Sequence, residues 1–360
     1  MRFPEFSGEW NKYTINDLAT VVGGGTPDTT VKSYWGGDIQ WFTPSEIGKN
    51  KYVDFSKRTI TRDGLDNSSA KLLPLHTILL SSRATVGECS IASNECTTNQ
   101  GFQSLIAKQC NIDFLYYLIQ TKKKDLIRNA CGSTFLEISA NEIRKIKVAV
   151  PVQNEQEQIA KLLSLIDERI ATQNKIIERY ESLIRGIAQN VIRSNKPNVL
   201  LSECLECSSS TLQESDVCEN GTYPVYGANG IVGYLDDYNT EDEAVHIIKD
   251  GSGVGTVSYA TGRCSATGTL NTLQAKDGYL LQYLYYMLKV FNFEPYKTGM
   301  AIPHIYFKDY GKAKIFCPSY TEQLKYVELL SAIDNKLSAE QSILTNLSLQ
   351  KQYLLRQMFI

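Results

Sequence analysis

The sequence predicts an α+β fold in which two similar mixed domains are each followed by one long helix, and the two helices pair as an antiparallel coiled coil. Three observations predict it: a duplicated segment, a heptad of apolar residues in both copies, and short strand-like runs before each copy. The predicted domains are residues 1–150 and 194–317, and the predicted helices are residues 151–193 and 318–360.

The duplication is the strongest internal signal. Residues 151–192 align without a gap on residues 318–359, at a constant offset of 167. Over residues 151–167 the identical pairs are Pro151/Pro318, Glu155/Glu322, Gln156/Gln323, Leu162/Leu329, Leu163/Leu330, Ser164/Ser331, Ile166/Ile333 and Asp167/Asp334. Such self-similarity indicates one structural unit that occurs twice in the chain.

Each copy carries apolar residues spaced alternately four and three apart, which is typical of a coiled coil. Both stretches follow a proline and open with acidic residues, as helix starts do. Each stretch predicts a helix of about 40 residues, or roughly 60 Å. The helix-pairing seam consists of Ile159, Leu163, Ile166, Ile170 and Ile177 in the first copy and Leu330, Ile333, Leu337, Leu344 and Leu354 in the second.

A narrow apolar stripe with polar flanks needs a facing helix, and each copy offers a stripe of the same length. A large domain between the copies favours antiparallel pairing. The alternative is that each helix is buried in the core of its own domain. The polar seam residues Gln173, Glu340 and Lys351 would help to set the register of the pair.

The segments before the two helices show short β-type runs separated by glycine and asparagine turns, each with an amphipathic helix further on. In the first segment the strands are expected at 39–42, 76–80 and 89–92, and the helix at 112–124. In the second, they are expected at 245–249, 255–259 and 269–273, with the helix at 280–290. Faint identities, such as Gly132/Gly299 and Ile138/Ile305, indicate two divergent domains of one type.

Charge and cysteine content narrow the functional classes. The net charge is −2; residues 1–150 carry three more basic than acidic groups, and residues 193–317 carry four more acidic than basic groups. Binding to DNA would therefore depend on local clusters or on a basic partner. Nine cysteines in a long chain favour reduced thiols, and no apolar run suits a signal peptide or a membrane span, so we expect a soluble cytoplasmic protein.

Signatures of catalysis and cofactor binding are missing from the sequence. Cys204 and Cys207 have zinc-like spacing but no second close pair, so we expect no metal site. The glycines of residues 251–255 lack the context of a dinucleotide loop, and there is no ATP-binding loop and no adenine-methyltransferase tetrapeptide. We therefore expect a subunit without catalysis or a cofactor of its own.

Several motifs resemble the specificity subunits of Type I restriction-modification enzymes. The likeness covers nearly the whole chain. The segments that carry it are 2–10 (RFPEFSGEW), 23–27 (GGGTP), 34–41 (YWGGDIQW), 67–74 (NSSAKLLP), 80–87 (LSSRATVG), 99–102 (NQGF), 223–230 (YPVYGANG), 250–255 (DGSGVG), and 151–167 with its copy.

This resemblance implies two target recognition domains that each read one half of a bipartite, asymmetric site in double-stranded DNA. It also implies that the helices hold the domains apart and dock two methyltransferase subunits, with two ATP-driven restriction subunits as further possible partners. S-adenosylmethionine, ATP and Mg would then belong to those partners. Two other classes stay open from the residues: a protein-interaction scaffold that reads no bases, which the neutral charge favours, and a stand-alone enzyme.

Candidate DNA contacts are polar residues in the predicted loops, because side chains that reach base edges give sequence specificity. In the first domain they are Thr26, Pro27, Ser45, Ser82, Arg83, Thr85, Asn99 and Gln100, with Lys122, Lys123 and Lys124 as phosphate contacts. In the second they are Tyr226, Asn229, Lys249, Ser252, Arg263, Thr267 and His304. Arg83 lies in a Ser/Thr-rich turn, where it is a candidate contact to guanine or, equally, an ordinary surface ion pair. The lysine run also fits a solvated helix end.

Overall fold

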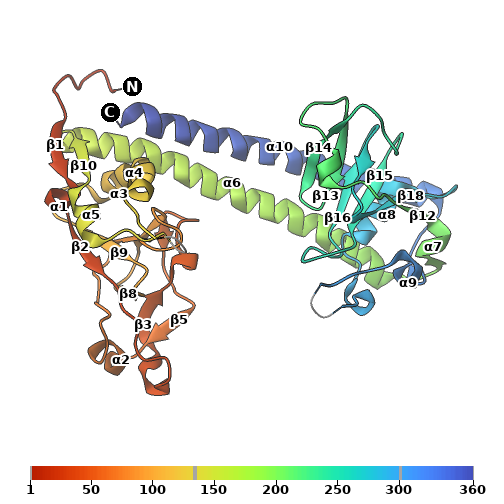
Figure 1. Cartoon of the computed structure of the whole chain (residues 1–360). Coiled ribbons are helices and arrows are strands. Elements are labelled where there is room, and N and C mark those ends of the chain that lie inside the picture. Colours follow the sequence, from red (N-terminus) through yellow and green to blue (C-terminus); the bar gives the residue numbers. More distant parts are fainter. Residues whose placement is uncertain (1, 133–135, 300–301, 360) are drawn as a thin grey trace. The chain divides into compact units, whose positions relative to one another are not determined.

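The computed structural model describes residues 2–132, 136–299 and 302–359. It contains two compact units: residues 1–174 together with 342–360 form unit 1, and residues 175–341 form unit 2. Each unit therefore contains one mixed domain and a part of each long helix (Figure 1).

The domain of unit 1 contains two main sheets and a short terminal ribbon. The five-stranded sheet has the order β2 (Ala19–Gly23), β9 (Gln103–Ala107), β6 (Ile78–Leu80), β7 (Cys89–Ala92) and β4 (Tyr52–Val53). The three-stranded sheet has the order β5 (Arg58–Ile60), β3 (Trp35–Phe42) and β8 (Cys96–Thr98), and the ribbon pairs β1 (Asn11–Thr14) with β10 (Lys147–Val150).

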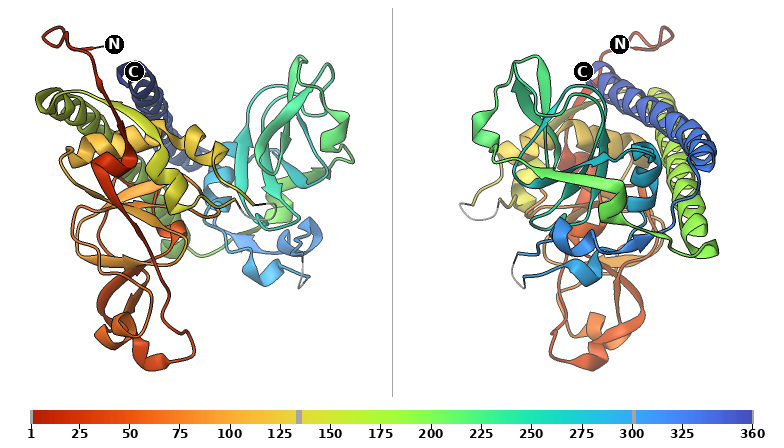
Figure 2. Two further views of the ribbon diagram at one scale, coloured as in Figure 1. Left: turned by 60° about the vertical axis from the view of Figure 1, so that its left-hand side comes forward. Right: turned by 90° about the vertical axis from the view of Figure 1, so that its right-hand side faces the viewer.

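Short helices complete the domain of unit 1. They are α1 (Ile15–Leu18), α2 (Arg62–Asp66), α3 (Ile112–Thr121), α4 (Lys123–Arg128) and α5 (Ala140–Lys145), with 3₁₀ turns at Lys32–Tyr34 and Pro44–Glu46. The predicted helix at 112–124 is thus two helices, because the backbone at Lys122 leaves the helical region. Helix α3 lies between the five-stranded sheet and the long helix α6 (Gln153–Ser194) (Figure 2).

The domain of unit 2 repeats this arrangement. Its four-stranded sheet has the order β12 (Leu205–Ser209), β18 (Leu270–Ala275), β15 (Ala244–Ile248) and β16 (Val257–Ala260). Its second sheet has the order β14 (Gly230–Leu235), β13 (Tyr223–Gly227) and β17 (Ser265–Ala266), and its ribbon pairs β11 (Val199–Leu200) with β19 (Lys314–Ile315). The helices are α7 (Leu201–Cys204), α8 (Leu281–Leu288) and α9 (Phe307–Tyr310), with 3₁₀ turns at Glu214–Asp216 and Glu294–Tyr296.

The two domains share one topology, as the sequence predicts. Strand order β2-β9-β6-β7 in unit 1 matches β12-β18-β15-β16 in unit 2, and both smaller sheets contain a parallel pair, β3 with β8 and β13 with β17. One difference concerns the sheet edge. In unit 1 the strand β4 pairs in parallel with β7, whereas β16, the counterpart of β7, is the last strand of its sheet.

Two long helices follow the domains: α6 (Gln153–Ser194, 42 residues) and α10 (Tyr320–Met358, 39 residues). Within unit 1 the start of α6 packs against the end of α10, since Ile159, Leu163 and Leu354 share one buried cluster. The prediction of an antiparallel pair is confirmed. Every predicted seam residue is buried or half-buried: Ile159, Leu163, Ile166, Ile177, Leu330, Leu337 and Leu354 are buried, and Ile170, Ile333 and Leu344 are half-buried.

The identical residues at the two helix starts make identical contacts. The side-chain oxygen of Gln156 accepts from the backbone N–H of Asn111 at 3.0 Å, and its amide nitrogen donates to the Pro151 carbonyl at 2.9 Å. Gln323 does the same with Leu280 and Pro318, at 2.9 and 3.0 Å. Buried backbone groups need such partners, so this glutamine fixes each domain to the helix that follows it.

His246, in the middle of β15, is a buried histidine whose ring nitrogens have no hydrogen-bond partner among the described residues. Burial lowers its pKa to about 4. Because the unfolded chain binds a proton near pH 6.5 and the folded one only near pH 4, stability falls as the pH is lowered through this window.

We expect the domain of unit 2 to lose roughly 2 kcal/mol of stability between pH 8 and pH 5 from this group. Hydrogen exchange of the β15 amides measures this loss. His246→Phe should flatten the pH dependence, whereas the exposed His76→Phe should leave it unchanged. If stability falls equally with pH in the wild type and in His246→Phe, other groups cause the fall.

Candidate DNA-binding loops and the helix network

Several predicted DNA contacts of the first domain come from separate loops that meet at one place. The Thr26 hydroxyl donates to the side chain of Gln100, which joins the loop after β2 to the loop after β8. The backbone N–H of Ser82 donates to the Gly101 carbonyl at 2.8 Å, which adds the loop after β6. The structure thus gathers Thr26, Ser82 and Gln100 from segments far apart in the sequence.

The loop of residues 81–88, here called the β6–β7 loop, has a fixed shape. Ala84 and Gly87 have φ values of 62° and 89°, and the backbone N–H of Gly87 donates to the Ser81 carbonyl at 3.0 Å. The Ala84 N–H donates to the Leu136 carbonyl at 3.1 Å, and Arg83 Nε lies 3.7 Å from Glu137 Oε2. Arg83 is exposed at the surface of this loop.

The second domain builds the same loop pair, which continues the offset of 167. The Ile138 N–H donates to the Ser82 carbonyl, and the Ile305 N–H donates to the Lys249 carbonyl, both at 2.9 Å. Likewise, the Gly251 N–H donates to the Pro303 carbonyl at 3.0 Å, as Ala84 does to Leu136. We call residues 81–88 with 131–132 and 136–138, and residues 249–255 with 298–299 and 302–305, the paired loops.

The side chains across the paired loops have opposite polarity in the two domains. Arg83 faces Glu137 in the first, whereas in the second Asp250 faces His304, whose Nδ1 lies 2.6 Å from the Asp250 carboxylate. These positions correspond at the offset of 167. Arg83 and His304 were predicted from the sequence, whereas Glu137 and Asp250 were not, although the constant offset relates both pairs.

The other candidates of the first domain differ in accessibility. Ser45, Thr85 and Gln100 are exposed and Asn99 is half-buried, whereas Pro27 and Ser82 are buried beneath the loop surface. Of the lysine run, Lys123 is paired with Glu88, Lys122 is half-buried and Lys124 is exposed. The structure therefore leaves Ser45, Thr85 and Gln100 accessible from solvent and Pro27 and Ser82 inaccessible.

In the second domain, Thr267 and Tyr226 lie together, three other candidates lie on the paired loops, and Arg263 and Asn229 lie apart from them. Thr267 donates its backbone N–H to the Tyr226 carbonyl at 2.8 Å, and its side chain is buried. Lys249 and Ser252 lie on the paired loops with His304. Arg263 is exposed; it pairs with Glu241 at 3.2 Å and lies over the Tyr238 ring at 4.8 Å. Asn229 is exposed at the turn before β14.

Arg58 is an exposed cation that the sequence analysis missed. Its guanidinium carbon lies 3.6 Å from the ring centroid of Trp35, and the Trp41 ring lies edge-on to Trp35 at 5.0 Å. The Trp41 indole N–H donates to the Gly25 carbonyl at 2.9 Å. This stack connects the small sheet to the loop that holds Thr26. The signal in the sequence was a pair of tryptophans, Trp35 and Trp41, followed by Arg58 on the neighbouring strand.

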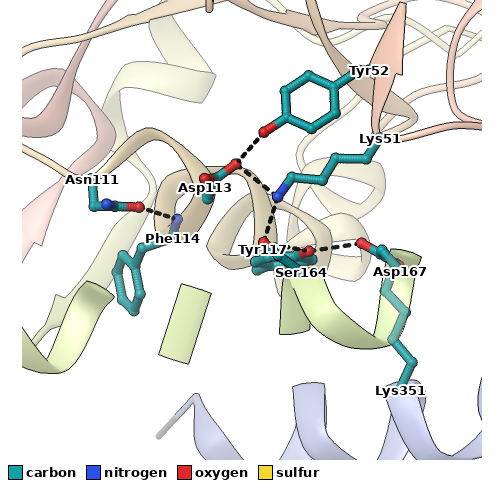
Figure 3. A network of polar contacts seen from close by, with 9 residues as sticks. All are labelled: Lys51, Tyr52, Asn111, Asp113, Phe114, Tyr117, Ser164, Asp167 and Lys351. Atoms are coloured by element: carbon teal, nitrogen blue, oxygen red, sulfur yellow. Dashed lines mark hydrogen bonds and ion pairs between the residues drawn. The ribbon is translucent and has the colours of Figure 1, made fainter. Parts of the chain in front are cut away.

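A polar network joins the first domain to both long helices within unit 1 (Figure 3). Lys51 Nζ lies 2.7 Å from Asp113 Oδ1 of α3 and 2.6 Å from Ser164 Oγ of α6. The Tyr117 hydroxyl donates to Asp167 at 2.7 Å, and Asp167 pairs with Lys351 of α10 at 2.7 Å. Burial and the Asp167 carboxylate raise the pKa of Tyr117, which keeps its phenol protonated as a donor.

The surface of the helix pair in unit 1 carries an apolar groove of about 620 Å³ between α6 and α10. Leu165 and Ile343 line it and are 49% and 45% exposed. Large apolar side chains that stay exposed together in one groove favour a partner surface.

Among the residues that the structure describes, no group of three or more His, Cys, Asp or Glu side chains is placed to hold a metal ion. The nine cysteines are free thiols. Over the same residues, no helix has the length and apolarity that crossing a bilayer requires.

The duplicated domain with its antiparallel helix pair defines a known class of protein. A family model described as the Type I restriction modification DNA specificity domain matches residues 7–182 and 201–348, and the chain belongs to this family. The resemblance found in the sequence motifs is thereby confirmed.

Particular relatives carry the same description. The chain is 39% identical over 182 residues to the Type I restriction enzyme MjaIX specificity subunit of Methanocaldococcus jannaschii, a match that covers 48% of this chain and 41% of that protein. It is 23% identical over 356 residues to the EcoprrI specificity subunit of Escherichia coli, covering 91% and 87%. The crystal structure of the S subunit of a Type I restriction-modification system from M. genitalium has the same fold, with a TM-score of 0.62, 19% identity and coverage of 100% and 99%.

Proposed function

We propose that this chain is the DNA-reading subunit of a Type I restriction-modification complex and that its two domains read the two halves of a bipartite, asymmetric site. The paired loops carry this proposal, since one backbone frame occurs twice with different side chains on it. Identical reading domains favour palindromic sites. Two divergent domains in one chain allow the half-sites to differ.

The helix pair serves as the docking surface for the subunits that perform the chemistry. The apolar groove with Leu165 and Ile343 supports this role. We propose two methyltransferase subunits as partners, which bring S-adenosylmethionine, and two restriction subunits with ATP and Mg as a further addition. A base that is to be methylated must leave the duplex for a pocket, which on this proposal belongs to the methyltransferase.

A scaffold without base readout is the second candidate, because a net charge of −2 is unusual for a protein that binds DNA by itself. The two candidates differ in what a change in the paired loops does. In a scaffold, such a change leaves the methylated sequence unaltered.

Arg83→Ala tests this directly. If Arg83 forks onto a guanine, the variant should bind the cognate site about 5- to 150-fold more weakly and accept other bases at one position of one half-site. The readout is methylation of a randomised DNA library by the complex with its methyltransferase. The matched control is Lys145→Ala, which removes an exposed cation that pairs with Glu142 at 2.8 Å on α5. Unchanged base preference in Arg83→Ala would favour the scaffold.

A further inference from the structure

The cleft between α8 and the long helices in unit 2 is the counterpart of the polar network of unit 1. Tyr286 and Asp334 correspond to Tyr117 and Asp167, and the Tyr286 hydroxyl lies 3.4 Å from Asp334. Tyr285 corresponds to Tyr116 in the same way. Both units thus place two tyrosines of a short helix beside an aspartate of a long helix.

In unit 1, two lysines of the same chain fill this place. Lys51 is 8% exposed, contacts Asp113 and Ser164, and lies 5.0 Å from the Tyr117 ring centroid. Lys351 neutralises Asp167 at 2.7 Å and lies 5.7 Å from the same ring. The aspartate, the tyrosine ring and the ammonium groups form one closed cluster.

In unit 2, other residues stand at the positions of Lys351 and Asp113. At the offset of 167, the counterpart of Lys351 is Ile184; at the offset of 169, which relates Tyr117 to Tyr286, the counterpart of Asp113 is Gln282. Lys51 enters its cleft from the segment just before β4, but the four-stranded sheet of unit 2 ends at β16. The result is an open cleft of about 470 Å³ that Ile184, Tyr285, Tyr286 and Asp334 help to line.

The charges at this cleft are not paired with one another. Within the described chain, no ion pair within 4.0 Å involves Glu181, Arg185, Lys289 or Asp334. The first three are exposed and therefore well hydrated, whereas Asp334 is half-buried. Lys289 Nζ lies 5.1 Å from the ring centroid of Tyr285. Asp334 is thus the carboxylate of this cleft with the least access to water, and like Glu181 it is paired with no cation of the described chain.

We propose that this cleft binds an alkylammonium group, which takes the place that lysines of the chain fill in unit 1. The group fits because a carboxylate and an aromatic face together favour a cation on an apolar stem. A lysine side chain of a protein partner and a free polyamine share this chemistry. That the ammonium group belongs to a lysine of a protein partner rests on the proposed function, whereas binding of an alkylammonium group in the cleft does not.

The first test titrates the full chain with n-butylammonium at neutral pH, with n-butanol as the uncharged control, and follows the ring signals of ¹³C-labelled Tyr285 and Tyr286. We expect saturable shifts with the amine only. Asp334→Asn should weaken binding about tenfold or more, as expected for a lost charge-assisted contact.

A second variant makes the result independent of misfolding. Ile184→Lys restores the counterpart of Lys351, so it should close the cleft from within and abolish amine binding in a folded chain. Ile184→Met is the size-matched control and should still bind. Absence of amine-induced shifts in the wild type, equal shifts with n-butanol, or undiminished binding in both Asp334→Asn and Ile184→Lys would overturn the proposal.

Reductive dimethylation of lysines in the complex of this chain with its methyltransferase identifies the source of the ammonium group. A partner lysine that is protected with wild type but reactive with Asp334→Asn identifies a side chain as the ligand. If amine binding is present and no partner lysine changes, the ligand is a free amine. Failure of the DNA-reading proposal would leave the titration of the isolated chain unaffected.

Discussion

Truncation of Leu163 to alanine should lower the free energy of unfolding of unit 1 by roughly 3–5 kcal/mol, the upper range for a leucine in a closed core. Leu163 is fully buried on α6, in one cluster with Phe114 of α3 and Leu354 of α10. Three elements meet at this side chain, so none can move inward alone to fill the cavity. The loss should therefore exceed that of an isolated helix contact.

Tryptophan fluorescence during urea unfolding measures this effect selectively, because all three tryptophans (Trp10, Trp35 and Trp41) lie in unit 1. The control is Leu165→Ala, two residues further on α6, where the side chain is 49% exposed. It should leave the unfolding midpoint nearly unchanged but weaken docking of a partner in the groove. Equal midpoints for Leu163→Ala and Leu165→Ala would contradict the packing described for α6.

Replacement of Lys51 by methionine should destabilise unit 1 by about 2–3 kcal/mol, because it leaves Asp113 and Ser164 without their shared cation in a cleft with little water. The methionine stem retains most of the apolar contact with the tyrosine rings, so the loss reports mainly on the charge. The same fluorescence-detected unfolding measures it.

Two further variants separate the ion pair from a general effect of lysine removal. Lys49→Met changes an exposed lysine of the same loop and should be nearly neutral. Asp113→Asn in the Lys51→Met background should recover part of the loss, because it removes the uncompensated carboxylate. If the double variant is less stable than Lys51→Met alone, the Asp113 carboxylate is held by other groups, such as the Tyr52 hydroxyl at 2.9 Å.

The amino-acid sequence by itself determined the architecture of this protein. The offset of 167 and the heptads that contain Leu163 and Leu330 can be read from the order of residues alone. Because residues at heptad spacing lie on one face of a helix, they form the buried stripe. The strand at 89–92 and the two short helices were predicted for the same reason: their patterns are local.

Tertiary structure alone decided which side chains face one another. The pairs Arg83–Glu137 and Asp250–His304, and the insertion of Lys51 between α3 and α6, join residues whose separation along the chain carries no periodic signal. Ser82 and Thr267 are likewise buried next to segments distant in the sequence, at Gly101 and Tyr226. Local patterns fix the elements, but contacts between distant loops depend on how those elements pack.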